Sequence, residues 1–142
     1  MRSMKPHTEN WLGLSVYDLE VAKDLLKSER YVYAVFMCHL STEKLLKAAV
    51  VEFTEHDPPP KIHGLKRLVE IAGLAVTEEQ MKLLVELTDQ QQRTRYPEDI
   101  VALGKVYTGE YAERLLKQTE EFRAWLEPKI KSAPPSANTS GR

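Results

Sequence analysis

Three residues with polar, ionisable side chains recur at every fourth position in an otherwise apolar segment of the chain. His39, Glu43 and Lys47 are four residues apart, and at 100° per residue they form one narrow stripe on a helix. Glu43 and Lys47 have the spacing of an i,i+4 ion pair. Lys44 is the only other charged residue between positions 33 and 51. Polar groups so rare on an apolar helix need a partner or a function.

The same stripe is compatible with a purely structural role. A helix that is apolar on most sides is normally buried, and its polar stripe can reach water while lysine stems lie along apolar surface. The opposite side carries small residues, which would let a neighbouring helix approach closely: Ala34, Ser41, Ala48 and Ala49. We interpret His39 and Glu43 as a structural polar stripe, with Glu43 orienting or ion-pairing inside the fold. Lys44 and Lys47 are candidate ligand contacts.

A second polar group follows a later apolar pattern, in the sequence QQQRTRYPED over 90–99. Pro97 disfavours the helical conformation at Tyr96, so a helix is expected to end close to Arg95, with Arg93 and Arg95 in its last turn. Arginines there interact favourably with the helix dipole and can cap the helix without any ligand. If a ligand binds, the arginines would contact phosphate and Tyr96 would stack on a base.

The elements that must position these residues are all predicted to be helices. Thr8 is the expected N-cap of the first helix, Thr77 and Gln80 form a capping box, and the three prolines at 58–60 end the second helix. Apolar residues at helical spacing predict helices up to about residue 27, then over about 31–55, 62–72, 77–95 and 108–131. No strand pattern competes. The sequence therefore predicts an all-α up-and-down bundle of about five helices, in one domain over 1–132, with a disordered tail over 133–142.

Composition narrows the functional classes. The 142 residues carry 20 Lys and Arg against 21 Asp and Glu, a formal net charge of -1. Because no global basic field attracts nucleic acid, any such contact must be local. The N-terminus has no signal-peptide core and no apolar run reaches the length of a membrane span, so we expect a cytoplasmic protein with no membrane association.

Metal and cofactor sites are not indicated. Cys38 is the single cysteine, which excludes an intramolecular disulfide and a cysteine-based zinc site, and it is expected to lie in the core. His7, His56 and His63 are isolated in sequence, and no Glu-x-x-His pair is present. We therefore predict no metal and no cofactor.

The order of these pieces resembles the HEPN family (higher eukaryotes and prokaryotes nucleotide-binding domain). The resemblance rests on YAVFMCHLSTEKLLKA over 33–48, on His63-Gly64-Leu65 after the proline loop, and on Arg95-Tyr96-Pro97. It covers roughly Asn10 to Phe122. The Glu-Lys-x-x-Lys-Ala part is the most specific, and the other pieces gain weight from their order.

The resemblance implies a compact bundle that pairs as a homodimer. It also implies a gene often placed beside a small nucleotidyltransferase in a two-gene module of toxin–antitoxin type. Many family members are metal-independent ribonucleases that carry an Arg, a polar residue and then a His around the end of a late helix. Here no histidine follows Arg93 or Arg95. The chain resembles a variant with an Arg-Tyr-Pro motif and without the ribonuclease Arg…His motif, so we lean against an enzymatic role.

Three functional hypotheses follow. The first is a dimeric module that binds a nucleotide or RNA, or docks a nucleotidyltransferase, through Arg93, Arg95 and Tyr96, with His63, Lys44 and Lys47 as secondary contacts. The second is a metal-independent ribonuclease that uses Arg95 and a nonstandard base, His63. The third is a purely structural dimerisation bundle without a ligand.

Overall fold

The chain folds into helices throughout the described part. The structure, a computed structural model, describes residues 3–95 and 100–132. Within these residues it contains six helices and no strand. In chain order they are α1 Pro6–Lys27, α2 Tyr31–Phe53, α3 Leu65–Ala72, α4 Glu78–Arg95, α5 Ile100–Val106 and α6 Gly109–Lys131. The predicted all-α bundle is confirmed, and the predicted tail over 133–142 lies outside the described residues.

Two element predictions need correction. The short helix α5 was not expected, because seven residues that include Gly104 are too few to show a helical period. The third helix begins at Leu65, about one turn later than expected at residue 62. Gly64 has extended backbone (φ -73°, ψ 117°), and the Leu65 amide instead donates to the Thr88 hydroxyl (3.3 Å). The segment before Leu65 is therefore a loop held against α4.

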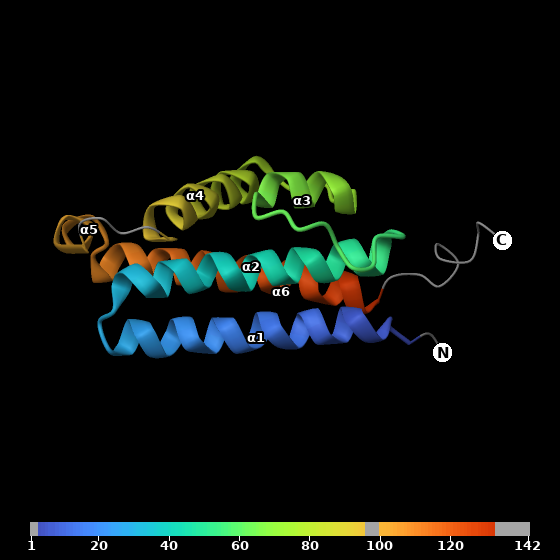
Figure 1. The fold of residues 1–142 in the computed structure, drawn as a ribbon, viewed down its shortest axis with the longest axis horizontal. Helices are drawn as coiled ribbons and strands as arrows, with labels where there is room; N and C mark the ends of the chain where they lie inside the picture. The colour runs from blue at the N-terminus through green and yellow to red at the C-terminus, as the bar shows by residue number, and fades with distance from the viewer. Residues whose placement is uncertain (1–2, 96–99, 133–142) are drawn as a thin grey trace.

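The helix α2 lies at the centre of the bundle. The three long helices α1, α2 and α6 lie side by side, and α3 and α4 cover α2 from a second layer (Figure 1). Most residues of α2 are buried, including the polar side chains of His39, Ser41 and Glu43. An apolar pattern on most sides of this helix predicted such burial.

Small residues allow α1 and α2 to approach closely. The Ser15 hydroxyl donates to the Ser41 carbonyl, and the Ser41 hydroxyl donates to the Ser15 carbonyl, each at 2.7 Å. Such reciprocal bonds require the two backbones to lie near each other, as the small residues of α2 predicted. The Arg123 Nε of α6 also donates to the Ser15 hydroxyl (3.2 Å). Three helices are thus joined at one point.

The outer ends of α1 and α2 cap each other. The Glu52 carboxylate accepts from the Lys5 amide (3.2 Å) and the Thr8 hydroxyl (2.8 Å) at the positive end of α1. The Lys5 ammonium donates to the carbonyls of Val51 (2.8 Å) and Thr54 (3.1 Å) at the end of α2. Thr8 is therefore not the N-cap that we expected. The helix begins at Pro6, whose fixed φ suits the first helical position.

Two helices end in the same backbone motif with different residues at its strained position. In α1 the Arg30 amide donates to the Leu25 carbonyl (2.8 Å), and Glu29 has φ 62°. In α3 the Leu74 amide donates to the Val69 carbonyl (3.1 Å), and Gly73 has φ 71°. This is the Schellman arrangement, which favours glycine because a Cβ is strained at positive φ. In α1 the residue at this position is Glu29, so the backbone is strained there.

We expect opposite effects from exchanging the residue type at these two positions. Glu29→Gly should raise the free energy of unfolding by about 0.5–1 kcal/mol by relieving left-handed strain. Gly73→Ala should lower it by about 1 kcal/mol. An added Cβ at Gly73 meets nothing within 4 Å, so the cost there comes from the backbone alone. Urea unfolding of both variants measures the changes. A loss of stability in Glu29→Gly would contradict the assignment.

Candidate functional site

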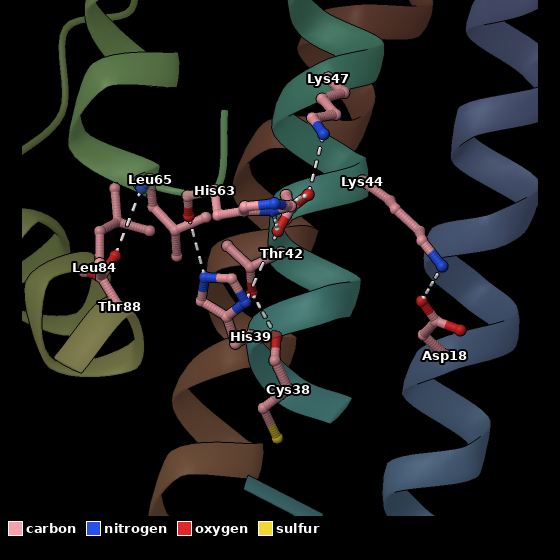
Figure 2. A network of polar contacts seen from close by, with 11 residues as sticks. Asp18, Cys38, His39, Thr42, Lys44, Lys47, His63, Leu65, Leu84 and Thr88 are labelled. Atoms are coloured by element: carbon pink, nitrogen blue, oxygen red, sulfur yellow. Dashed lines mark hydrogen bonds and ion pairs between the residues drawn. The ribbon is translucent and has the colours of Figure 1, made fainter. Parts of the chain in front are cut away.

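A network of polar side chains connects α2 to the loop before α3, as Figure 2 shows for His39, Lys47 and His63. The contacts of Glu43 place it at the centre of this network. The Glu43 carboxylate is buried and accepts a hydrogen bond from the Lys47 ammonium (2.9 Å). Both carboxylate oxygens lie 3.3 Å from Nδ1 of His63. The predicted i,i+4 pair of Glu43 and Lys47 is therefore confirmed, and His63, 20 residues along the chain, joins it.

His39 lies one helical turn before Glu43 and holds the same loop through the backbone carbonyl of His63. Its Nε2 is 3.1 Å from the His63 carbonyl oxygen and donates to it, because a carbonyl can only accept. Its Nδ1 is 3.7 Å from the Glu43 carboxylate, which is too far for a hydrogen bond. Burial lowers the pKa of His39 to about 4, although the Glu43 charge opposes this shift. His39 is therefore a neutral donor near neutral pH.

His63 is consequently held at both its backbone and its side chain. Buried groups one turn apart on α2 bind its carbonyl and its imidazole, and the Leu65 amide two residues later is bound by Thr88 of α4. The side chain of His63 is nevertheless 55% exposed. Because a carboxylate accepts from Nδ1–H, this contact leaves Nε2 as the nitrogen with a free lone pair. The arrangement presents an oriented imidazole at the surface.

The two lysines of α2 already have protein partners. Lys47 is largely buried against Glu43, and its ammonium lies 5.6 Å from the centre of the Trp11 ring. Lys44 lies 2.5 Å from the buried carboxylate of Asp18 on α1. Both positive charges therefore compensate buried carboxylates of the fold, as Figure 2 shows for Lys44 and Asp18.

Arg93 lies on a different face of α4 from Thr88, the residue that holds the His63 loop. With Gln90 it forms part of the face of α4 that meets Tyr107, since the Tyr107 hydroxyl donates to Gln90. Burial raises the pKa of Tyr107, and the nearby positive charge of Arg93 opposes that rise. Thr88, which holds the His63 loop, is five residues before Arg93 and so about 140° away around the helix. The structure therefore divides the predicted site residues into two groups.

The last two predicted contacts, Arg95 and Tyr96, lie at the end of the described part of α4 and directly after it. Arg95 is the last residue of α4, as expected from the following proline, and its side chain is outside the described part. Tyr96 lies outside the described residues. Asp18 and Thr88 belong to the network but were missed in the sequence, because each contacts a residue on another helix and no local spacing connects the two.

Metal ligation is not supported by the described geometry. Although His39, Glu43 and His63 are neighbours, no group of three His, Cys, Asp or Glu in residues 3–95 and 100–132 is arranged to hold a metal ion. The Glu43 carboxylate contacts the Lys47 ammonium, and His39 binds a backbone carbonyl. Cys38 is buried, and burial raises the pKa of its thiol to about 12.

Within the same described residues no helix has the length and apolarity needed to cross a membrane.

Comparison with known proteins identifies relatives of the whole bundle. The profile of the HEPN domain matches residues 8–129. The crystal structure of ST0689, described as an archaeal HEPN homologue, aligns with a TM-score of 0.69 at 20% sequence identity. The alignment covers 87% of this chain and 98% of that one. No curated protein matches the chain.

The pKa of His39 predicts how stability depends on pH. The unfolded chain binds a proton at this histidine below its ordinary pKa of 6.5, whereas the folded chain does not until about pH 4. The free energy of unfolding therefore falls as pH decreases from 6.5 to 4, by up to about 3 kcal/mol from this residue. Above pH 6.5 the contribution is fully present.

Urea unfolding at pH 7 and pH 4.5 measures the effect. His39→Gln keeps an amide donor for the His63 carbonyl but cannot be protonated. The pH dependence of this variant should be shallower than that of the parent, because Glu43, Lys47 and His63, which face His39, are the same in both chains. Equal pH dependence in both chains would show that His39 does not titrate as assigned.

Proposed function

Because this chain belongs to the HEPN domain family, we propose that it binds RNA or a nucleotide, as a homodimer and as the partner of a small nucleotidyltransferase in a two-gene module of toxin–antitoxin type. The observation that carries the ligand proposal is the orientation of His63. A surface histidine is held at its backbone carbonyl by His39 and at its imidazole Nδ1 by Glu43, both buried groups of α2. Binding sites require side chains that are oriented before the ligand arrives.

The energetic cost of the network supports a role beyond packing. Burying the Glu43 carboxylate and the Lys47 ammonium costs desolvation energy that their attraction need not repay. Apolar residues of similar volume at these positions would be expected to stabilise the bundle as well or better. The charged pair instead places a carboxylate directly behind an exposed imidazole. Nε2 of His63 can then accept from a ribose hydroxyl when the imidazole is neutral, or donate to a phosphate oxygen when the imidazole is protonated.

Arg93 supplies a second contact in this proposal. It is exposed near the end of α4, and a guanidinium binds phosphate with two parallel hydrogen bonds. Arg95 would act in the same way, and Tyr96 would stack on a base. Lys44 and Lys47 contribute indirectly in this proposal. Lys44 pairs with Asp18 and Lys47 pairs with Glu43, so both positive charges are already compensated within the fold. A ligand that spans both sides of α4 fits RNA better than a single nucleotide.

We expect His63→Ala and Arg93→Ala each to weaken RNA binding by about tenfold or more, because each removes a hydrogen bond to a charged group. Fluorescence anisotropy with a short labelled RNA, and separately with labelled ATP, measures the affinity. Matched controls are His56→Ala and Arg67→Ala, which remove an exposed histidine and an exposed arginine whose side chains have no described contact with the network around Glu43.

The outcomes separate the hypotheses. Unchanged affinity in both site variants, with circular dichroism melts like that of the parent, would reject these residues as contacts. If the parent itself binds neither RNA nor ATP, the purely structural dimerisation bundle is favoured. The partner is indicated independently if the adjacent reading frame encodes a small protein with Gly-Ser followed by an Asp-x-Asp pair.

One observation favours a ribonuclease as the second candidate function. With Nδ1 of His63 on Glu43, the free lone pair is on Nε2, the nitrogen that a general base needs. Nε2 would take the proton of a ribose 2′-hydroxyl while that oxygen bonds to phosphorus. The bond to the 5′-oxygen then breaks, and the imidazolium returns the proton to the leaving oxygen. The products are a 2′,3′-cyclic phosphate and a 5′-hydroxyl.

This candidate predicts RNA cleavage that depends on both members of the pair. His63→Ala should abolish the cyclic-phosphate product, and Glu43→Gln should reduce its rate by at least about tenfold, because it weakens the orientation of the imidazole. Gel analysis of a labelled RNA in the presence of EDTA follows the reaction. Intact RNA after prolonged incubation with concentrated parent protein would reject the ribonuclease.

A further inference from the structure

A groove lined by tyrosines lies at the end of the bundle opposite the start of α1 and the end of α6. There the turn between α1 and α2, the helix α5 and the start of α6 come together (Figure 1). The groove has a volume of about 300 Å³, and Tyr31, Tyr33 and Tyr107 line it together with Glu29 and Arg30. It is distinct from the network around His63, because it shares no lining residue with that network.

Two of the three tyrosines are fixed by the surrounding fold. Tyr107 is fully buried, its hydroxyl donates to Gln90, and its ring centre lies 5.7 Å from that of Tyr111. The Tyr31 ring packs so closely on Gly109 that a Cβ there would lie 3.0 Å from the tyrosine hydroxyl. These rings form a rigid base for the groove before any ligand binds.

Tyr33 differs from the other two because 46% of its surface is exposed. The described structure provides no aromatic ring contact for it. An aromatic face beside a groove of this size can stack on one planar ring, and every nucleobase has such a face. Base stacking on exposed tyrosines is a common mode of single-stranded RNA recognition.

The charges around the groove fit a nucleotide rather than an apolar peptide. Arg30 is exposed and uses one Nη1 bond for the Ser28 carbonyl (2.8 Å), which leaves further guanidinium donors for a phosphate. Lys105 is exposed in the last turn of α5, and the charge of Arg93 reaches Tyr107. Arg30 thus lines the groove, Lys105 directly follows the lining residue Gly104, and Arg93 lies near the lining residue Tyr107. The Glu29 carboxylate would repel phosphate and can accept from an N–H on a base edge.

The backbone at Glu29 is a further sign of function. This residue has the strained left-handed conformation (φ 62°) and lines the groove, although glycine would relieve the strain, as at Gly73. Strain of this kind is often retained where a side chain has a role. The side chain at Glu29 is the feature that glycine would remove.

We propose that this groove binds one base of the RNA, with Tyr33 stacked on the base and Arg30 and Lys105 on the adjoining phosphate. The inference rests on the proposed RNA-binding function and deepens it by locating a base. The ring enters between Tyr33 and the fixed tyrosines, and the backbone passes toward Arg93. Recognition by stacking tolerates any base, so sequence preference at this position should be weak.

The test compares a six-nucleotide RNA with an abasic oligomer of the same length and charge, both labelled for anisotropy. Tyr33→Ala should weaken RNA binding by at least about fivefold, the effect of losing one base–aromatic stack. It should leave binding of the abasic oligomer unchanged. Tyr33→Phe keeps the ring and should bind RNA like the parent. Tyr17→Ala is the matched control, because Tyr17 is a 66% exposed tyrosine of α1 that does not line the groove.

Each alternative outcome is distinct. If the parent binds RNA and Tyr33→Ala binds it equally well, the groove is not a base site, while the proposed function stands. If the parent binds neither oligomer, the proposed function fails and this inference fails with it. If Tyr33→Ala instead changes the protein from dimer to monomer in sedimentation velocity, the groove receives a second copy of the chain and the inference is overturned.

Discussion

The buried carboxylate of Glu43 is the interaction on which the arrangement of the site depends. A carboxylate without partners inside a helical bundle would be too costly to keep ionised. Glu43 avoids that cost because Lys47 of its own helix and His63 of the following loop both contact it. The charge thereby connects a central helix to the imidazole of the loop before α3. Removing it would leave a buried ammonium without its partner and a surface histidine without orientation.

The other buried polar side chains of α2 form hydrogen bonds with different neighbouring elements. His39 is neutral and donates to a carbonyl, so its burial needs no counter-charge. Ser41 exchanges hydrogen bonds with Ser15 and sets the close approach of α1. Glu52 accepts from the first turn of α1, where the helix dipole favours a negative charge. The helix that forms the core therefore also determines how its neighbours attach.

The helix α4 separates the two surfaces that we connect with RNA. One side of it holds the His63 loop through Thr88, and another side meets Tyr107 and the tyrosine-lined groove near Arg93. A mononucleotide can occupy one of these surfaces at a time. A chain of several nucleotides can follow the end of the helix and contact both. In the function that we propose, this separation favours a ligand of several nucleotides over a mononucleotide.

The amino-acid sequence by itself determined five of the six described helices, the burial of α2 and the ion pair of Glu43 and Lys47, because helical periodicity and i,i+4 spacing are local. It also carried the resemblance to the HEPN family, which the matching profile confirms. The tertiary structure alone decided that His63 reaches Glu43 across a proline loop and that Arg93 lies near Tyr107. Contacts between distant segments depend on how helices pack and rotate against one another, and short-range spacing contains no information on that rotation.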